Sequence, residues 1–213
     1  LITIANGYNL DVYGNWVNNG GSFSGTTGIV TFRGVSKTVS GTAFTSFPAI
    51  VIASAASYSM TNNNSCTTLS FSQGSTSSLS ITACTFTVNG NASISNTSFS
   101  GNNALHIING AVVVGGNLTV GSGTSQGSRI ARVVVNNSTL TIGGNLSYNT
   151  GNVSSGVVDL STGNSTMNIA GSITLNSAGT LSPGTSSLVN FNGTLAGQTV
   201  TFGSGITYNS LAF

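Results

Sequence analysis

Very few side chains in this sequence could take part in acid–base, nucleophilic or metal chemistry. The chain has two carboxylates, Asp11 and Asp159, one histidine, His106, and two cysteines, Cys66 and Cys84. A glycosidase needs two carboxyl groups no more than about 10 Å apart, and a metal site needs clustered ligands. Here the carboxylates are far apart in the sequence, and His106 stands alone in an apolar run. We therefore expect no enzyme activity, no cofactor and no metal.

The charge of the chain also excludes several classes of partner. Charged residues make up 3% of the sequence, and the net charge is +2. The four cations, Arg33, Lys37, Arg129 and Arg132, are too few for a phosphate-binding stripe, so we expect no nucleic-acid partner. No apolar run approaches about 18 residues, so we expect no membrane span. Ser, Thr and Asn supply 90 residues and must provide the solubility that charges provide elsewhere.

A ten-residue phrase recurs between residues 85 and 175 and indicates a repeat architecture. Its copies begin at Thr85, Ala111, Thr139 and Thr166 and read TFTVNGNASI, AVVVGGNLTV, TLTIGGNLSY and TMNIAGSITL. A similar phrase, YNLDVYGNWV, starts at Tyr8. Each half of the phrase alternates apolar and polar residues, which is the period of a β-strand rather than of a helix. The glycines between the halves mark a corner.

These short strands and corners predict the fold. Two or three strands in about 27 residues make one coil of a parallel β-helix, and the coils stack at the strand spacing of about 4.8 Å. We predict an all-β, right-handed parallel β-helix, or β-solenoid, of about eight coils. The hand follows from the usual chirality of β-crossover connections. We expect a single domain over 1–213, with residues 53–64 as a protruding loop.

One asparagine recurs at the corner of the phrase. Asn91, Asn117 and Asn145 hold this position in successive copies, and Asn15 holds it in the earliest phrase. Identical amides that stack along a solenoid can form a hydrogen-bonded ladder. We predict an inward Asn ladder of this kind, in which the preceding glycine supplies a positive φ. The three residues also begin Asn-x-Ser/Thr sequons, but an inward amide could not carry a sugar.

The chain has ten sequons, against roughly eight expected by chance from its composition. The number alone therefore does not indicate a glycoprotein. Any glycans are expected at corner or loop positions, where the candidate residues are Asn63, Asn96, Asn137, Asn152 and Asn164.

The two cysteines, Cys66 and Cys84, have a spacing that fits no common arrangement of metal ligands. A separation near one coil could place them side by side on adjacent rungs, within bridging range. In an extracellular protein we expect a disulfide between them. The alternative is two buried free thiols.

The two ends of the sequence suggest how molecules could associate. The sequence starts at Leu1, without a signal peptide, so we expect a secreted protein, outside the cell or on its surface, whose signal peptide has been removed. The last three residues fall at the same strand position of the repeat as Ile2-Thr3-Ile4 at the beginning. Open strand edges favour pairing with other chains. A head-to-tail homopolymer would join through Ile2, Thr3, Ile4, Leu211, Ala212 and Phe213. The alternative is a segment of a longer repeat array.

Two glycine-rich runs, at 21–34 and 179–193, have similar patterns. The first is followed by Lys37-Thr38-Val39 and the second by Gln198-Thr199-Val200. The pattern resembles the β-solenoid repeats of large secreted surface proteins of the filamentous-haemagglutinin-like adhesin type. The resemblance implies a parallel β-helix at the cell surface and transfers no catalytic residue.

Three functions remain open from the sequence. The first is a non-enzymatic structural subunit of an extracellular filament or surface fibre, and the second is a segment of an adhesin that binds a glycan or a surface. A distant third is ice binding, because a β-solenoid can present a flat array of hydroxyls. That array would be formed by Ser93, Thr119, Ser147 and Thr174.

Overall fold

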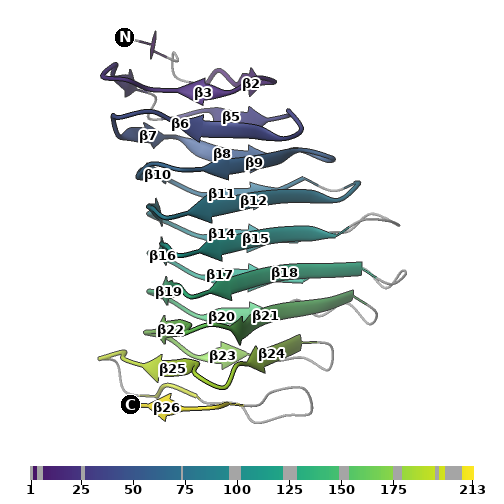
Figure 1. Ribbon diagram of the computed structural model, residues 1–213, viewed down its shortest axis with the longest axis vertical. Coiled ribbons are helices and arrows are strands. Elements are labelled where there is room, and N and C mark those ends of the chain that lie inside the picture. Colours follow the sequence, from purple (N-terminus) through teal and green to yellow (C-terminus); the bar gives the residue numbers. More distant parts are fainter. Residues whose placement is uncertain are drawn as a thin grey trace.

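The computed structural model describes residues 2–3, 7–24, 27–72, 74–95, 102–121, 129–148, 154–174, 179–194, 197–199 and 208–213, and within them every regular element is a β-strand. The strands form three parallel sheets of eight strands and one separate pair. Since each coil adds one strand to each sheet, the chain winds through about seven turns. Figure 1 shows these coils stacked along the long axis, with the two termini at opposite ends. The predicted parallel β-solenoid is confirmed, and the expected number of coils is close.

Each sheet forms one face of the solenoid, and its strands are as follows. Sheet 1 contains β2 (Leu10–Val12), β5 (Ile29–Phe32), β8 (Ala49–Ile52), β11 (Leu69–Phe71), β14 (Ala92–Ile94), β17 (Leu118–Val120), β20 (Leu146–Tyr148) and β23 (Ile173–Thr174). Sheet 2 contains β3 (Trp16–Val17), β6 (Lys37–Ser40), β9 (Ser57–Met60), β12 (Ser77–Thr82), β15 (Asn103–Ile108), β18 (Arg129–Asn136), β21 (Ser154–Thr162) and β24 (Gly179–Pro183). Sheet 3 contains β7 (Thr45–Phe47), β10 (Asn64–Cys66), β13 (Thr85–Val88), β16 (Ala111–Val114), β19 (Thr139–Ile142), β22 (Thr166–Ile169), β25 (Leu188–Phe191) and β26 (Leu211–Ala212). The separate pair is β1 (Ile2–Thr3) with β4 (Phe23–Ser24).

The core is a set of apolar columns that run along the axis. In β19, Leu140 and Ile142 are fully buried, whereas the two threonines that alternate with them are only half-buried, as the two-residue period of the sequence predicts. Leu140 lies opposite Val112 of the preceding coil and Met167 of the following one. Every strand therefore adds its inward residues to columns shared with its neighbours, and the whole interior is one continuous core.

The length of the coil varies along the chain. Leu10 of β2 lies opposite Val30 of β5, 20 positions later, whereas Val112 lies opposite Leu140, 28 positions later. The phrase at 8–17 consequently falls on a different corner from the later copies. It spans the corner between sheets 1 and 2, and the copies from residue 85 onward span the corner between sheets 3 and 1.

The expectation of a protruding loop at 53–64 is wrong. Strand β9 lies within this segment and pairs with β6 on one side and β12 on the other. The segment ends in β10, where Asn64 and Ser65 are buried despite being polar. Asn64 accepts a hydrogen bond from the Thr45 backbone N–H and donates one to the Asn62 carbonyl. These bonds replace the apolar contacts that the sequence lacks here.

Candidate interaction surfaces

The corner between sheets 3 and 1 carries a ladder of side chains, but it differs from the predicted one. Asn91 Oδ1 accepts a hydrogen bond from the Asn117 backbone N–H at 2.8 Å, and Asn117 Oδ1 accepts one from the Asn145 N–H at 2.8 Å. The series continues through Asn145 to the Ser172 N–H and through Ser172 Oγ to the Thr199 N–H. All three asparagines are exposed. The ladder therefore lies on the surface, and each step joins a side chain to the backbone of the next coil rather than one amide to another.

The glycine before each ladder residue has a different purpose from the one predicted. Gly116, Gly144 and Gly171 do not have positive φ. A Cβ on Gly144 would clash with Asn117 Oδ1 and would lie 2.9 Å from the Gly116 carbonyl group. Glycine is required because adjacent coils approach too closely at this corner for any side chain, which is its other common use.

Asn15 belongs to a different corner. Its Oδ1 accepts a hydrogen bond from the Thr38 backbone N–H at 3.0 Å, between sheets 1 and 2. The chemistry of the ladder is thus repeated here, but Asn15 is not part of the column of Asn91, Asn117 and Asn145.

The predicted glycosylation sites fall largely on one further corner. Asn63, Asn137 and Asn164 are exposed between sheets 2 and 3, and with Asn109 they line one shallow groove. Asn137 Nδ2 donates a hydrogen bond to Asn109 Oδ1 at 2.9 Å. A glycan requires an exposed asparagine, and these three side chains meet that requirement. Their modification stays a prediction. Two of the candidates lie outside the described residues, namely Asn96 and Asn152.

The predicted disulfide is absent, because Cys66 and Cys84 are both buried free thiols. Cys66 of β10 lies opposite Val88, so the coil that starts at Cys66 closes at Val88 and not at Cys84. Cys84 is therefore displaced from Cys66 by four positions, or about 13 Å, along the strand direction. That offset exceeds the range of a disulfide. Burial raises the pKa of both thiols, and the Sγ of Cys84 contacts the Met60 carbonyl oxygen at 3.4 Å.

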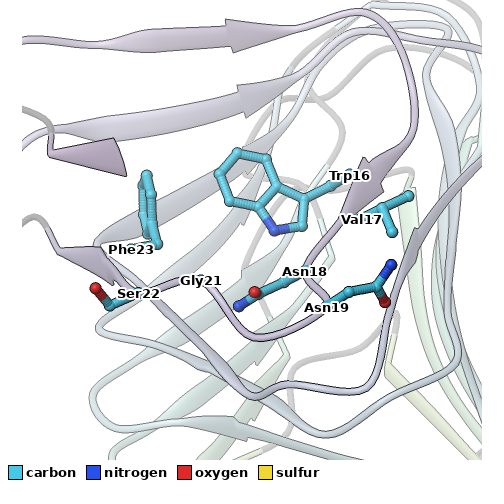
Figure 2. A pocket seen from close by; sticks show the side chains of 7 residues that line it. All are labelled: Trp16, Val17, Asn18, Asn19, Gly21, Ser22 and Phe23. Carbon is cyan, nitrogen blue, oxygen red and sulfur yellow. The ribbon is translucent and has the colours of Figure 1, made fainter. Parts of the chain in front are cut away.

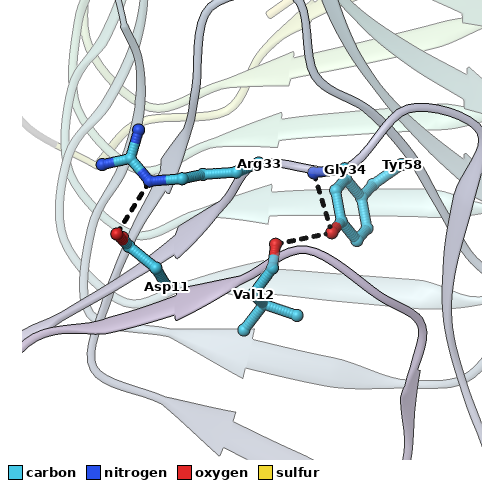
Figure 3. A network of polar contacts seen from close by, with 5 residues as sticks. All are labelled: Asp11, Val12, Arg33, Gly34 and Tyr58. Atoms are coloured by element: carbon cyan, nitrogen blue, oxygen red, sulfur yellow. Dashed lines mark hydrogen bonds and ion pairs between the residues drawn. The ribbon is translucent and has the colours of Figure 1, made fainter.

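A polar network ties the first three coils together (Figure 3). The Tyr58 hydroxyl on β9 donates to the Val12 carbonyl at 2.8 Å and accepts from the Gly34 N–H at 3.1 Å. Nearby, Arg33 forms an ion pair with Asp11 at 2.9 Å, and both side chains are more than 40% exposed. Burial raises the pKa of Tyr58, and the Gly34 hydrogen bond opposes that shift. The phenol is therefore a neutral group that links coils by hydrogen bonds rather than an acid or base.

The N-terminal end of the core contains aromatic rings and a small pocket (Figure 2). Trp16 packs edge-on against Phe23 and Phe47, with ring centroids 5.0 and 5.2 Å away. The pocket has a volume of about 160 Å³, less than the 300 Å³ or more usual for small-molecule sites. The Trp16 Nε1 is buried and has no hydrogen-bond partner among the described residues. Because β3 is the outermost strand of sheet 2 among the described residues, this pocket lies at the N-terminal end of that sheet.

The terminal strands lie on the same face at opposite ends of the solenoid. At the C-terminal end, β26 is the last strand of sheet 3, with Leu211 opposite Val189. At the N-terminal end, β1 pairs with β4, and β4 lies against β7 of sheet 3, with the ring of Phe23 5.6 Å from that of Phe47. Leu211 and Ala212 are half-buried and Phe213 is 85% exposed. Ile4 lies outside the described residues.

The predicted hydroxyl row exists as a line along sheet 1, in which Ser93, Thr119, Ser147 and Thr174 are successive partners. The line is one residue wide because each strand there has only one outward position. A single line gives little area to match a lattice in two dimensions.

The two carboxylates are not brought together. Asp11 is on the first strand of sheet 1 and Asp159 on the seventh strand of sheet 2, which separates them by roughly 30 Å along the axis. Among the described residues, no three His, Cys, Asp or Glu side chains are grouped so that they could hold a metal ion.

The described part of the chain has no helix that is both long and apolar enough to cross a membrane. Comparison with known protein families, curated proteins and solved structures finds no match to this chain. Its function must therefore be argued from its own geometry.

Proposed function

We propose that this chain is a non-enzymatic structural solenoid of an extracellular filament or cell-surface fibre, in which solenoids join end to end by strand pairing. The observation that carries the proposal is that β1 and β26 lie on the same face at opposite ends. A second copy that is shifted along the axis could thus place its β1 against β26 of the first. The partner in this assembly is the chain itself.

The other two faces support the same arrangement. Within the described residues, sheet 1 ends in β2 and β23, and sheet 2 ends in β3 and β24, so each face offers an edge strand at both ends. Edge strands carry unpaired backbone groups that favour pairing with another chain. Solenoids usually protect their ends with a polar cap, whereas among the described residues the outermost strand of sheet 2 borders the apolar pocket beside Trp16. Stacking would cover this apolar surface.

The test is negative-stain electron microscopy of the protein without denaturant. We expect fibres with an axial repeat of about 48 Å, because the joining face runs from β1 and β4 through the eight strands of sheet 3 and so adds ten rungs at the strand spacing. On β26 the Leu211 N–H faces the open edge, because the Val189 N–H bonds to the Ser210 carbonyl and residues 210 and 212 therefore face β25. Proline at position 3 or 211 removes a backbone donor, so Thr3→Pro and Leu211→Pro should abolish the fibres. Thr3→Ala and Leu211→Ile keep the donor and should assemble normally. Short rods of uniform length in the unmodified protein would overturn the proposal, as would fibres from both proline variants with unchanged circular dichroism.

A second candidate is a segment of a filamentous-haemagglutinin-like surface adhesin that binds a glycan. The outward face of sheet 2 favours it, because this sheet has the longest strands and presents serine and threonine hydroxyls together with an arginine and a histidine. Binding to immobilised polysaccharides by isolated short rods would support this candidate over the first. A location outside the cell is part of both proposals.

A further inference from the structure

Arg132 and His106 form a cationic pair on the outward face of sheet 2. Arg132 on β18 lies opposite Ala104 of β15, and His106 lies two positions further along the same strand, opposite Val134. The strand rise and spacing place their Cα atoms about 8 Å apart on a diagonal, within reach of an arginine side chain. Both residues are half-buried. In a chain with four Lys and Arg residues, this juxtaposition is distinctive.

Among the described residues, no carboxylate forms an ion pair with either member of the pair. The only ion pair there is that of Arg33 with Asp11, on sheet 1. The nearest carboxylate on the sheet is that of Asp159 on β21, which lies opposite Val134 and accepts a hydrogen bond from the Ser161 backbone N–H at 3.0 Å. The guanidinium of Arg132 therefore keeps its N–H donors available for an external acceptor. Arginine is well suited to this role, since its planar fork matches two oxygen atoms of a carboxylate or sulfate.

The surface beside the pair is hollowed. Asn102, Asn103, Ala104 and Ile130 line a pocket of about 220 Å³ together with His106 and Arg132. This is smaller than the pockets that enclose a drug-sized ligand. It suits one anionic group of a larger molecule that lies across the face. Hydroxyls flank the site along the sheet, from Ser78 and Ser80 on β12 to Thr180 and Ser182 on β24.

We propose that Arg132 and His106 bind an oxyanion, a carboxylate or a sulfate, carried by an acidic polysaccharide. Among the described side chains of this face, the hydroxyls and one arginine suit a polyhydroxylated chain. They do not suit nucleic acid or an anionic membrane, which require clustered cations. The proposal goes beyond axial assembly and does not depend on it, because one molecule carries the complete site.

The site should respond to pH through His106. Burial lowers the pKa of His106, and the positive charge of Arg132 lowers it further. Asp159 faces the same side, two strands away in the same column. A bound anion favours the protonated imidazole, so affinity should rise as the pH falls toward the lowered pKa of His106. For a carboxylated polymer the affinity should decline again near pH 4, where the ligand itself is protonated. For a sulfated polymer it should not decline.

The test is binding of the full chain to polygalacturonate, dextran sulfate and neutral dextran, measured by calorimetry from pH 4 to 8. We expect binding to at least one polyanion and none to dextran. Arg132→Gln should weaken that binding by at least about tenfold, because it removes charge-assisted hydrogen bonds. His106→Gln should abolish the rise in affinity at low pH.

The matched control is Arg33→Gln, which removes the same charge from sheet 1 and should leave the affinity unchanged. Equal weakening by Arg33→Gln and Arg132→Gln would overturn the proposal, because it would show non-specific attraction. Binding to neither polyanion would overturn it, and so would equally tight binding to poly-glutamate, which would indicate an acidic peptide as partner. Circular dichroism and thermal unfolding of each variant verify that the solenoid is intact.

Discussion

Asn117 joins its own coil to the next through a single oxygen atom. Its Oδ1 receives the Asn145 backbone N–H, while its own N–H is received by Asn91 Oδ1. The repeat phrase predicted which residues occupy this corner, because their spacing is visible in the sequence. It could not predict the bonding, because the two-residue alternation stops at the glycines and no longer fixes where a side chain points.

Replacing Asn117 by alanine should lower the free energy of unfolding by about 1 kcal/mol, since one side-chain-to-backbone hydrogen bond is lost on an exposed surface. Asn117→Ser should retain part of this stability, because Ser172 performs the same role with a hydroxyl. Urea denaturation followed by circular dichroism measures both variants. A midpoint for Asn117→Ala equal to that of the unmodified protein would show that the ladder bond does not contribute to stability.

Gly144→Ala should destabilise the solenoid by about 1–3 kcal/mol, the usual cost of overpacking. Its Cβ would meet Asn117 Oδ1 and the backbone of Gly116. Gly14→Ala is the control, because nothing lies within 4 Å of its Cβ position. Denaturation midpoints should separate the two variants clearly. If Gly144→Ala is harmless, the coils at this corner can move apart without cost, and the close approach is not what requires glycine.

At the scale of the element, strand β10 shows where sequence analysis fails. The strands of the repeated phrase were predicted because their buried positions are apolar. In β10 the buried positions include Asn64 and Ser65, and hydrogen bonds hold Asn64 in place. No hydrophobic period can reveal such a strand. The missing strand hid the true length of this coil, and the spacing of Cys66 and Cys84 was misleading as a result.

An aromatic group packs within the first coils. Phe32 packs against both Phe47 and Tyr58, and Trp16 and Phe23 extend the group to the end of the molecule. Aromatic pairs contribute about 0.5–1.5 kcal/mol beyond their buried area. Coils further along the chain have mostly aliphatic interiors. This end should consequently resist fraying.

Tyr58→Phe tests the fastening of these coils. The change leaves the ring in place but removes the acceptor of the Gly34 N–H and the donor to the Val12 carbonyl. A loss of about 1–3 kcal/mol is expected for buried groups left without partners. Relative to the unmodified protein, the variant should show a larger increase in hydrogen-exchange rate in residues 10–34 than in residues 111–148. Uniform acceleration along the chain would mean that the solenoid unfolds as a single unit and that Tyr58 has no local role.

For the whole molecule, the scarcity of charge determines how stability depends on pH. Burial raises the pKa of Tyr58, Tyr148 and Tyr208 and of both cysteines. In the unfolded chain thiols ionise near pH 8.5 and phenols near pH 10. Above these values the unfolded state loses protons that the folded state retains, so stability must fall as the pH rises.

On the acid side the sign is reversed. The pKa of His106 is lowered, so below about pH 6.5 the unfolded chain binds a proton that the folded chain does not. We therefore expect nearly constant urea midpoints between about pH 6.5 and 8.5, a shallow decline below that range and a steeper one above it. His106→Gln should remove the decline between pH 6.5 and 5. A midpoint that increases from pH 8.5 to 11 would contradict the assignment of buried phenols and thiols.

The direction of the bonds between coils has a consequence for a protein under tension. Hydrogen bonds join successive coils along the long axis, and Cys66 and Cys84 form no covalent link between them. A pull on the two ends would load these bonds one coil at a time. A coil of about 22 residues, such as that between Val189 and Leu211, adds about 4.8 Å of length while stacked but about 75 Å when drawn out. The solenoid would then lengthen in discrete steps and dissipate work at each one. It could therefore extend to many times its resting length before its covalent backbone carried the load.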